Sequence, residues 1–340
     1  MARRLGKSTI LMESDVSVSA FSSAVGKKEG ESLLKDCFDH IDSDDRFGQD
    51  NFELGETAMQ GLALEMLFQK RGLKDKDFDI IIGGDLTNQC IATGYAVREF
   101  QRPYLGIYSA CSTVSESMLI SALAVESGGA ERVAALASSH FCTAERQYRF
   151  PLEYGAVRTP TSQRTATACG AFAIEKGENA PYIRAVTVGK IEDKGILDAN
   201  NMGAAMAYAA YSTISGFLDD TGKSPDYFDH IITGDLGEVG TNILYELFDR
   251  DGRSIRQNHL DCGKMMYKNM NDVYSGGSGA GCSSAVMAGH ILPQIRDGKL
   301  RNVLFAATGA LLSVTSVQQN RSIPCISHLV WLSNKGGASG

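Results

Sequence analysis

One cysteine of this chain stands where a nucleophile could be placed. Cys111 lies in the segment YSACS (108–112), in the turn directly before a predicted helix, SESMLISALAVES (115–127). Backbone N–H groups and the helix dipole at such a position favour the thiolate and lower the pKa of the thiol. Cys111 is therefore a candidate nucleophile, and the alternative is a buried free cysteine that only fills space among small residues.

The segment around Cys111 has a counterpart that lacks the cysteine. YSGGS (274–278) sets Gly277 opposite Cys111, and Ser278 opposite Ser112. Each segment follows a copy of one motif, FDIIIGGDL (78–86) and FDHIITGDL (228–236), and the two copies share seven of nine positions. The chain therefore contains a duplicated unit, and only its first copy carries the candidate nucleophile.

Both copies read as helix, short buried strand, helix and strand, which is typical of βαβ units with right-handed crossovers. The helices predicted at 115–127 and 281–292 carry few charges, so we expect them to lie between two sheets. The sequence thus predicts an α/β protein with five layers, α-β-α-β-α, and mostly parallel or mixed sheets. We expect two duplicated halves, 1–180 with a loop insertion at 141–165, and 181–340.

Composition narrows the class of protein. The 340 residues carry a net charge of −7, and a protein that binds nucleic acid usually shows a basic stripe instead. We see neither a signal peptide nor an apolar run of about 18 residues, the length that a membrane span requires. The eight cysteines include no C-x-x-C pair, as expected for free thiols in a reducing compartment. These features predict a soluble intracellular protein.

The duplication, together with Ala110-Cys111-Ser112, resembles the thiolase superfamily over about residues 8–335. The resemblance implies a thiolase-like fold, a homodimer, and a pocket at Cys111. Condensing enzymes of that superfamily also use His or Asn from a Gly-rich segment and from the turn after a second-half strand. The matching stretches here, 274–281 and 233–236, have neither, and a carboxylate at Asp235 would oppose formation of the thiolate. We therefore expect no catalytic residues and no enzyme activity.

Several other residues are candidates for lining the pocket. His140 follows a predicted strand, and His328 lies with Cys325 in SIPCISHLV, which resembles the superfamily's C-terminal active-site strand. Cys325 and His328 point to opposite faces of a strand, so we expect no metal site there. The segment 141–170 carries Arg149, Arg158 and Arg164, which could bind carboxylates, or could lie at a dimer interface with solvated charges.

Two phrases, SHFCTAERQYRFPLEYG (139–155) and GGDLTNQ (83–89), are similar to the stage V sporulation protein AD group of this superfamily. That resemblance implies a binding protein for dipicolinic acid (pyridine-2,6-dicarboxylate), which imports it into the developing spore beside membrane proteins of a transport complex. It implies a peripheral place at the forespore membrane and no cofactor, unless calcium accompanies the ligand. The expected ligand-binding residues are Cys111, Ser112, His140, Arg149, Arg158, Arg164, Asp235, Ser278 and His328.

Two other classes of function remain open. One is an acyltransferase or ketoacyl-synthase-like condensing enzyme that uses Cys111 with a base such as His140 or His328. The other is a purely structural scaffold, in which the pocket would stay empty.

Overall fold

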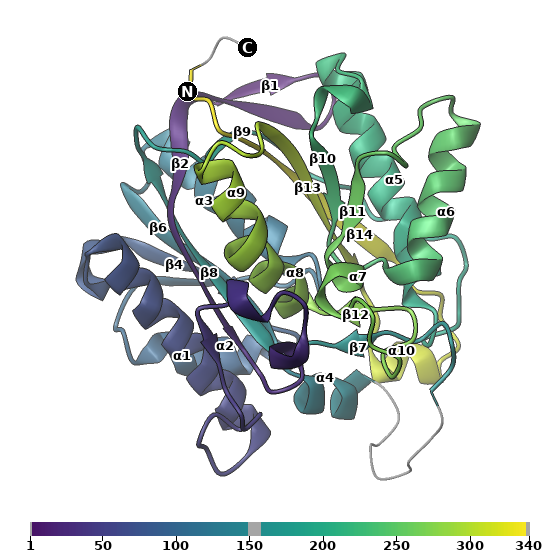
Figure 1. Ribbon diagram of the computed structural model, residues 1–340, viewed down its shortest axis with the longest axis horizontal. Helices are drawn as coiled ribbons and strands as arrows, with labels where there is room; N and C mark the ends of the chain where they lie inside the picture. The colour runs from purple at the N-terminus through teal and green to yellow at the C-terminus, as the bar shows by residue number, and fades with distance from the viewer. Residues whose placement is uncertain (1, 149–157, 338–340) are drawn as a thin grey trace.

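The computed structural model describes residues 2–148 and 158–337, and a large mixed β-sheet runs through its centre (Figure 1). The main path of this sheet follows the order β11-β10-β13-β14-β9-β2-β8-β6-β4-β5. The strands on the β5 side are β5 (Tyr104–Gly106), β4 (Ile80–Gly84), β6 (Arg132–Ser139), β8 (Ala168–Lys176) and β2 (Thr9–Val25). Those on the β11 side are β11 (His259–Asp261), β10 (His230–Thr233), β13 (Asn302–Ala310), β14 (Cys325–Ser333) and β9 (Tyr182–Thr187).

The two sides of this sheet have the same topology. From its outer edge inward, each side has two parallel pairings followed by two antiparallel ones. The motifs FDIIIGGDL and FDHIITGDL supply the equivalent strands β4 and β10. The two sides meet where β2 pairs antiparallel with β9. Two short strands, β1 (Arg3–Leu5) and β3 (His40–Ile41), also pair with β2. The sequence repeat is therefore a repeat of strand order and direction.

Helices cover the strands in layers, as the low charge of the central helices predicts (Figure 1). α1 (Phe52–Arg71) and α2 (Ile91–Arg98) lie on one outer side, and α5 (Met202–Thr221) and α6 (Gly237–Arg250) on the other. Between them lie α3 (Thr113–Ser127) and α8 (Ala280–Val286), and all seven residues of α8 are buried. α3 packs against strands of both sides of the sheet, so the expected five-layer, thiolase-like arrangement is confirmed.

The second central helix is less regular than the first. α8 continues through a π-helical turn, Met287–Ile291, into α9 (Leu292–Arg296). Smaller elements complete the fold: α4 (Phe141–Tyr148), α7 (Cys262–Met266), α10 (Val314–Gln318), and a two-stranded parallel ladder of β7 (Arg164–Thr165) with β12 (Gly277–Ser278). The ladder joins a segment of the first half directly to the segment opposite Cys111.

Two glycines allow the chain before α3 to approach the strand ends closely. A Cβ on Gly84, the last residue of β4, would lie 2.1 Å from the carbonyl oxygen of Ile107. A Cβ on Gly309, in β13, would lie 2.2 Å from the carbonyl oxygen of Ser109. Because only glycine fits at both positions, segment 107–111 lies between the ends of a first-half strand and a second-half strand.

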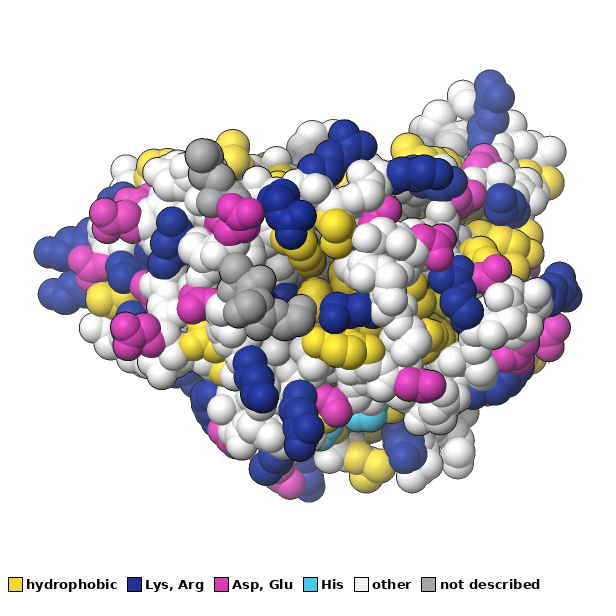
Figure 2. All heavy atoms as spheres, turned by 90° about the horizontal axis from the view of Figure 1, so that it is seen from above, with side chains coloured by type: hydrophobic (Ala, Val, Ile, Leu, Met, Phe, Trp, Pro, Cys, Tyr) yellow, Lys and Arg dark blue, Asp and Glu magenta, His cyan; other side chains and the backbone are white. Residues whose placement is uncertain are grey.

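The surface shows mixed charge on the face that carries the termini. Figure 2 shows basic and acidic side chains interspersed there, with hydrophobic side chains exposed in hollows between them. The part of this face that the structure describes has no continuous basic stripe. Among residues 2–148 and 158–337, no helix has both the length and the apolar composition needed to cross a membrane.

Candidate functional site

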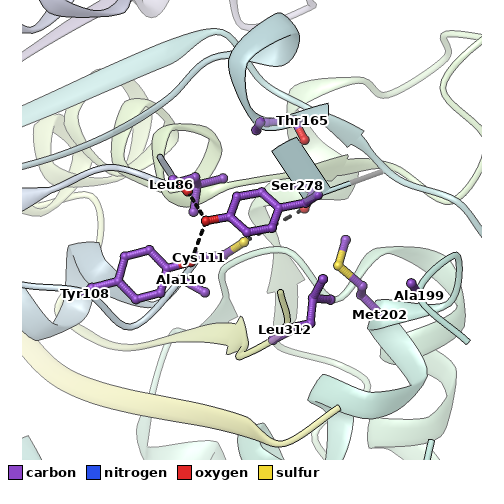
Figure 3. A pocket seen from close by; sticks show the side chains of 12 residues that line it. Leu86, Tyr108, Ala110, Cys111, Thr165, Ala199, Met202, Ser278 and Leu312 are labelled. Carbon is purple, nitrogen blue, oxygen red and sulfur yellow. Dashed lines mark hydrogen bonds between the residues drawn. The ribbon is translucent and has the colours of Figure 1, made fainter. Parts of the chain in front are cut away.

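A cavity lies where the two halves meet, beside Cys111 (Figure 3). It is narrow, with a volume of about 40 Å³, and it is lined mostly by apolar groups. A concave, mostly apolar lining with a few polar groups is typical of a site for a small molecule. The first half contributes Leu86, Tyr108, Ala110, Cys111, Ala144, Tyr148 and Thr165, and the second half contributes Ala199, Met202, Ser278, Ala310 and Leu312.

Cys111 reaches this cavity from a strained turn. Ala110 has a φ of 51°, in the left-handed region that residues with a Cβ seldom adopt, and α3 begins two residues after Cys111. The cysteine is 6% exposed, and its Sγ lies 3.9 Å from the Oγ of Ser278. The chain thus holds the thiol at the wall of the cavity.

Asp235 lies directly behind Ser278 and is fully buried. Its carboxylate accepts hydrogen bonds from the Ser278 hydroxyl (3.2 Å), the Gly279 N–H (2.9 Å) and the Thr308 hydroxyl (3.1 Å). Burial raises the pKa of Asp235 to about 7 despite these donors. The site therefore holds a carboxyl group that is neutral in a large part of the molecules near neutral pH.

A residue that the sequence did not single out fixes this arrangement. The side-chain amide of Gln163 donates to the backbone carbonyls of Asp235 (2.5 Å) and Gly277 (2.9 Å). It thereby holds the turn after β10 against the strand β12, which carries Ser278. Nothing in the composition of segment 159–165 marks Gln163 as different from its neighbours.

The thiol of Cys111 is poorly suited to act as a nucleophile. Burial raises the pKa of Cys111 well above its usual range, and the neighbouring Asp235 carboxyl raises it further. This direction is opposite to the one expected from the helix start alone. No histidine is among the described lining residues, so no imidazole there can accept the thiol proton.

The two candidate bases lie away from the cavity. The Nε2 atom of His140 lies 2.6 Å from the carbonyl oxygen of Asp45, and its Nδ1 accepts the N–H of Cys142. Burial lowers the pKa of His140, so the ring is neutral and serves to hold two loops together. His328 accepts the N–H of Gly189 at 3.3 Å, and burial lowers its pKa to about 4. Neither imidazole is among the lining residues.

Ser112 is also turned away from the cavity. Its hydroxyl donates to the carbonyl oxygen of Ser109 at 2.7 Å and stabilises the turn before α3. Ser112 is fully buried and does not line the cavity, whereas Ser278, its counterpart in the second copy, does. The first copy of the motif therefore contributes Cys111 to the cavity, and the second copy contributes Ser278.

The arginines differ from the expectation that they would bind a carboxylate in the cavity. Arg158 pairs with the buried Glu145 at 2.9 Å, and Arg164 stacks on Phe141 with 3.9 Å between its guanidinium carbon and the ring centroid. Neither lines the cavity. Arg149 lies outside the described residues. No lysine, arginine or histidine is among the lining residues that the structure describes.

Two tyrosines, Tyr108 and Tyr148, are the largest polar side chains at the cavity, and sequence reasoning did not select them (Figure 3). A signal for Tyr108 was present, because Tyr-Ser precedes the turn in both copies of the repeat. Within 2–148 and 158–337, no three His, Cys, Asp or Glu side chains lie close enough together to hold a metal ion.

Comparison with known protein families shows to which family this chain belongs. The family model described as Stage V sporulation protein AD (SpoVAD) matches residues 6–333. The chain belongs to the stage V sporulation protein AD family. Stage V sporulation protein AD of Bacillus subtilis (strain 168) is 39% identical over 334 residues, which cover 98% of this chain and 99% of that protein.

Solved structures similar to this stage V sporulation protein AD family member are thiolase-fold enzymes. 3-Oxoacyl-[acyl-carrier-protein] synthase III from Aquifex aeolicus VF5 has a TM-score of 0.60 and 14% sequence identity, and the match covers 94% of this chain and 99% of that one. A single-residue variant of OleA from Xanthomonas campestris has a TM-score of 0.59 and 12% identity, with coverage of 95% and 99%. At these identities the likeness establishes the fold alone.

Proposed function

We propose that this sporulation protein binds dipicolinate in the cavity beside Cys111 and does not turn it over. The observation that carries the proposal is the arrangement of Cys111, Ser278 and Asp235. A buried carboxyl group and a hydroxyl face the thiol, and no imidazole is present among the described lining residues. Such a site keeps the shape of a pocket while its described lining residues include no imidazole to activate a nucleophile.

Dipicolinate is the ligand that the sequence resemblance implies, and the cavity has features that suit it. The apolar walls offer contact surface to a planar aromatic ring. We propose that the backbone N–H groups of Ala110 and Cys111 meet one carboxylate, because that of Ser112 already donates to the Ser109 carbonyl oxygen (3.1 Å). Asp235 stays behind Ser278, and its raised pKa limits the repulsion that it exerts on an anionic ligand.

Calorimetry with dipicolinate tests the proposal directly. We expect saturable binding to the wild-type chain, modest weakening by Cys111→Ala, and loss of binding in Cys111→Trp, because the indole would fill the cavity. A control variant, Lys190→Ala, changes an exposed side chain away from the cavity and should bind like wild type. Equal affinity in wild type and Cys111→Trp would place the ligand elsewhere.

An acyl-CoA labelling assay separates this function from that of a condensing enzyme. We expect no acyl group on Cys111 after incubation with acyl-CoA, because its thiol is held protonated. An acylated Cys111 that a second substrate discharges would contradict the binding function and support the acyltransferase alternative.

The proposal extends to the assembly in which the protein works. We propose a homodimer that pairs through the edge strand β5, whose Leu105 is 49% exposed although it is a large apolar residue. We also propose peripheral attachment at the forespore membrane through membrane proteins of the same transport complex, with calcium accompanying the ligand when it binds. Sedimentation of the wild-type chain and of Leu105→Glu tests the dimer, because a charge on this edge should yield monomers.

A further inference from the structure

The hydroxyl groups of the two tyrosines at the cavity, Tyr108 and Tyr148, are hydrogen-bonded to each other, and Figure 3 marks the bond from Tyr108 by a dashed line. Tyr108 precedes the turn at Cys111, and Tyr148 is the last residue of α4. Their hydroxyl oxygens lie 3.1 Å apart, and the Tyr148 hydroxyl also donates to the backbone carbonyl of Leu86. Tyr148 therefore links α4 to the loop after β4 by a hydrogen bond, and Tyr108 is hydrogen-bonded to Tyr148.

The position of each hydroxyl proton follows from these contacts. A phenol has one proton, and that of Tyr148 points at the Leu86 carbonyl. The Tyr148 oxygen then accepts from the side-chain amide of Gln147 at 3.2 Å and from Tyr108. Tyr108 is thus the donor of the Tyr108–Tyr148 pair. Partial desolvation of the hydroxyl and its hydrogen bond to Tyr148 raise the pKa of Tyr108, so this donor keeps its proton throughout the neutral range.

The other hydroxyl protons at the cavity are committed to buried acceptors. Ser278 donates to Asp235 at 3.2 Å, and Thr165 donates to Glu145 at 3.1 Å. If Tyr148 turned its proton toward a ligand, the Leu86 carbonyl would lose that hydrogen bond, which is costly for a buried group. Tyr108 differs, because rotation about its C–O bond redirects the proton and leaves Tyr148 still hydrogen-bonded to Leu86 and Gln147.

We propose that the Tyr108 hydroxyl donates a hydrogen bond to a carboxylate of the ligand in the cavity, and that Tyr148 is a positioning residue for Tyr108. This inference rests on the proposed binding function and names the side-chain donor that the described arginines do not supply. Tyr108 is 42% exposed, so its ring lies at the mouth of the cavity, where an entering ligand meets it first.

Three single variants test this assignment. Tyr108→Phe should weaken dipicolinate binding about 10- to 100-fold by calorimetry, the range for a hydrogen bond to a charged group. Tyr148→Phe should weaken it less, about 3- to 10-fold, since the donor remains but is less well oriented. Tyr274→Phe is the matched control: Tyr274 holds the equivalent place in YSGGS, is 50% exposed and does not line the cavity. It should leave binding unchanged.

A double-mutant cycle distinguishes positioning from a general structural role. If Tyr148 acts through Tyr108, adding Tyr148→Phe to Tyr108→Phe should cause no further loss of affinity. Additive losses would assign Tyr148 an independent role and contradict its positioning of Tyr108. Thermal unfolding of each variant confirms that the compared proteins are folded.

The outcomes separate this assignment from the proposed function. If wild type binds dipicolinate and Tyr108→Phe binds equally well, the tyrosine assignment is wrong and the binding function stands. If wild type does not bind dipicolinate but binds benzoate or picolinate, and Tyr108→Phe weakens that binding, the dipicolinate function fails and Tyr108 remains a carboxylate donor. If none of the three carboxylates binds wild type, both are wrong.

Discussion

Asp85 and Asp235 occupy the same place in the two copies of the repeat but hold different parts of the molecule. Asp85 accepts hydrogen bonds from the backbone and hydroxyl groups of Thr87 and Thr93, both within eight residues of it. The side-chain partners of Asp235 lie 43, 44 and 73 positions further along the chain. The first aspartate folds its own loop, and the second supports the wall of a cavity.

A third carboxylate, that of Asp261, holds the loop after β10, so Asp235 does not have to do so. In the second half, Asp261 accepts the N–H groups of Leu236 (2.8 Å) and Gly237 (3.1 Å), and so it holds the loop that follows β10. Asp85 performs that task in the first half. The loop after β4 is therefore held by the aspartate of the motif itself, and the loop after β10 by an aspartate at the end of the neighbouring strand β11.

Replacing each aspartate by asparagine should give the largest difference between the halves. Each oxygen of Asp85 accepts a backbone N–H, from Thr87 or Thr93, so an amide NH₂ must face one of these donors. We expect Asp85→Asn to lower the free energy of unfolding by about 3 kcal/mol. Asp235→Asn should cost about 1 kcal/mol, because the Thr308 hydroxyl can turn to accept from the amide. Urea unfolding at about pH 5, where Asp235 is protonated, measures both, and equal losses would contradict the difference in roles.

The next largest difference in stability should come from alanine substitutions at Gly277 and Cys111, which occupy the same place in the two copies. A Cβ on Gly277 would lie 2.9 Å from the Cys282 Sγ and 3.2 Å from the Gly263 Cα. We therefore expect Gly277→Ala to destabilise the protein by about 2 kcal/mol through overpacking. Cys111→Ala at the equivalent place should cost less than about 1 kcal/mol, since Cys111 borders an open cavity. Thermal unfolding compares the two, and an equally tolerant Gly277 would show that the second copy has room for a side chain.

The raised pKa of the buried Asp235 should make the free energy of unfolding depend on pH. Its pKa is about 7 in the folded protein and near 3.8 when unfolded, so between these values the folded state binds more protons. The contribution of this group to stability is complete below about pH 4 and is lost as pH rises through 7. Between pH 5 and 6, the stability of wild type should fall more steeply than that of Asp235→Asn, by about 1.4 kcal/mol per pH unit. Parallel profiles from urea unfolding would contradict the raised pKa.

The smallest effect concerns the reactivity of Cys111. Because Asp235 helps to raise the pKa of this thiol, Asp235→Asn should accelerate its alkylation by iodoacetamide at about pH 8 roughly three- to tenfold. Peptide mass spectrometry measures the rate, and Cys142, which does not line the cavity, serves as the internal control. An unchanged rate at Cys111 would show that burial alone controls this thiol.

Much of the fold could be predicted because the relevant signals are local and occur twice. The apolar runs after FD predicted β4 and β10, and the weakly charged segment 115–127 predicted the buried helix α3. The repeat also brought Cys111 and the motif of Asp235 and Ser278 into one site, because equivalent turns of the two halves meet at the same strand ends. These inferences depend on backbone pattern, which the sequence carries in short stretches.

The direction of long side chains could not be predicted in this way. Arg158 pairs with the buried Glu145, and Arg164 stacks on the ring of Phe141. Both partners lie in α4, so their positions depend on how this helix packs. The segment 158–165 alone says nothing about which neighbour a guanidinium will reach. The repeated Tyr-Ser pair marks Tyr108, but its hydrogen bond to Tyr148, 40 positions away in sequence, could not be predicted for the same reason.

The place of β2 in the sheet has a consequence for synthesis. This strand of 17 residues begins at Thr9, yet its two long neighbours are β8 and β9, at 168–176 and 182–187, and only the short strands β1 and β3 pair with it nearby in sequence. On the ribosome, β2 leaves the exit tunnel while β8 and β9 are still untranslated, and about 150 residues must follow before it can pair with them. At roughly 5–20 residues per second, β2 is without its two long partners for about 10–30 seconds. The central pairing of the sheet therefore forms only when the first half of the chain is complete.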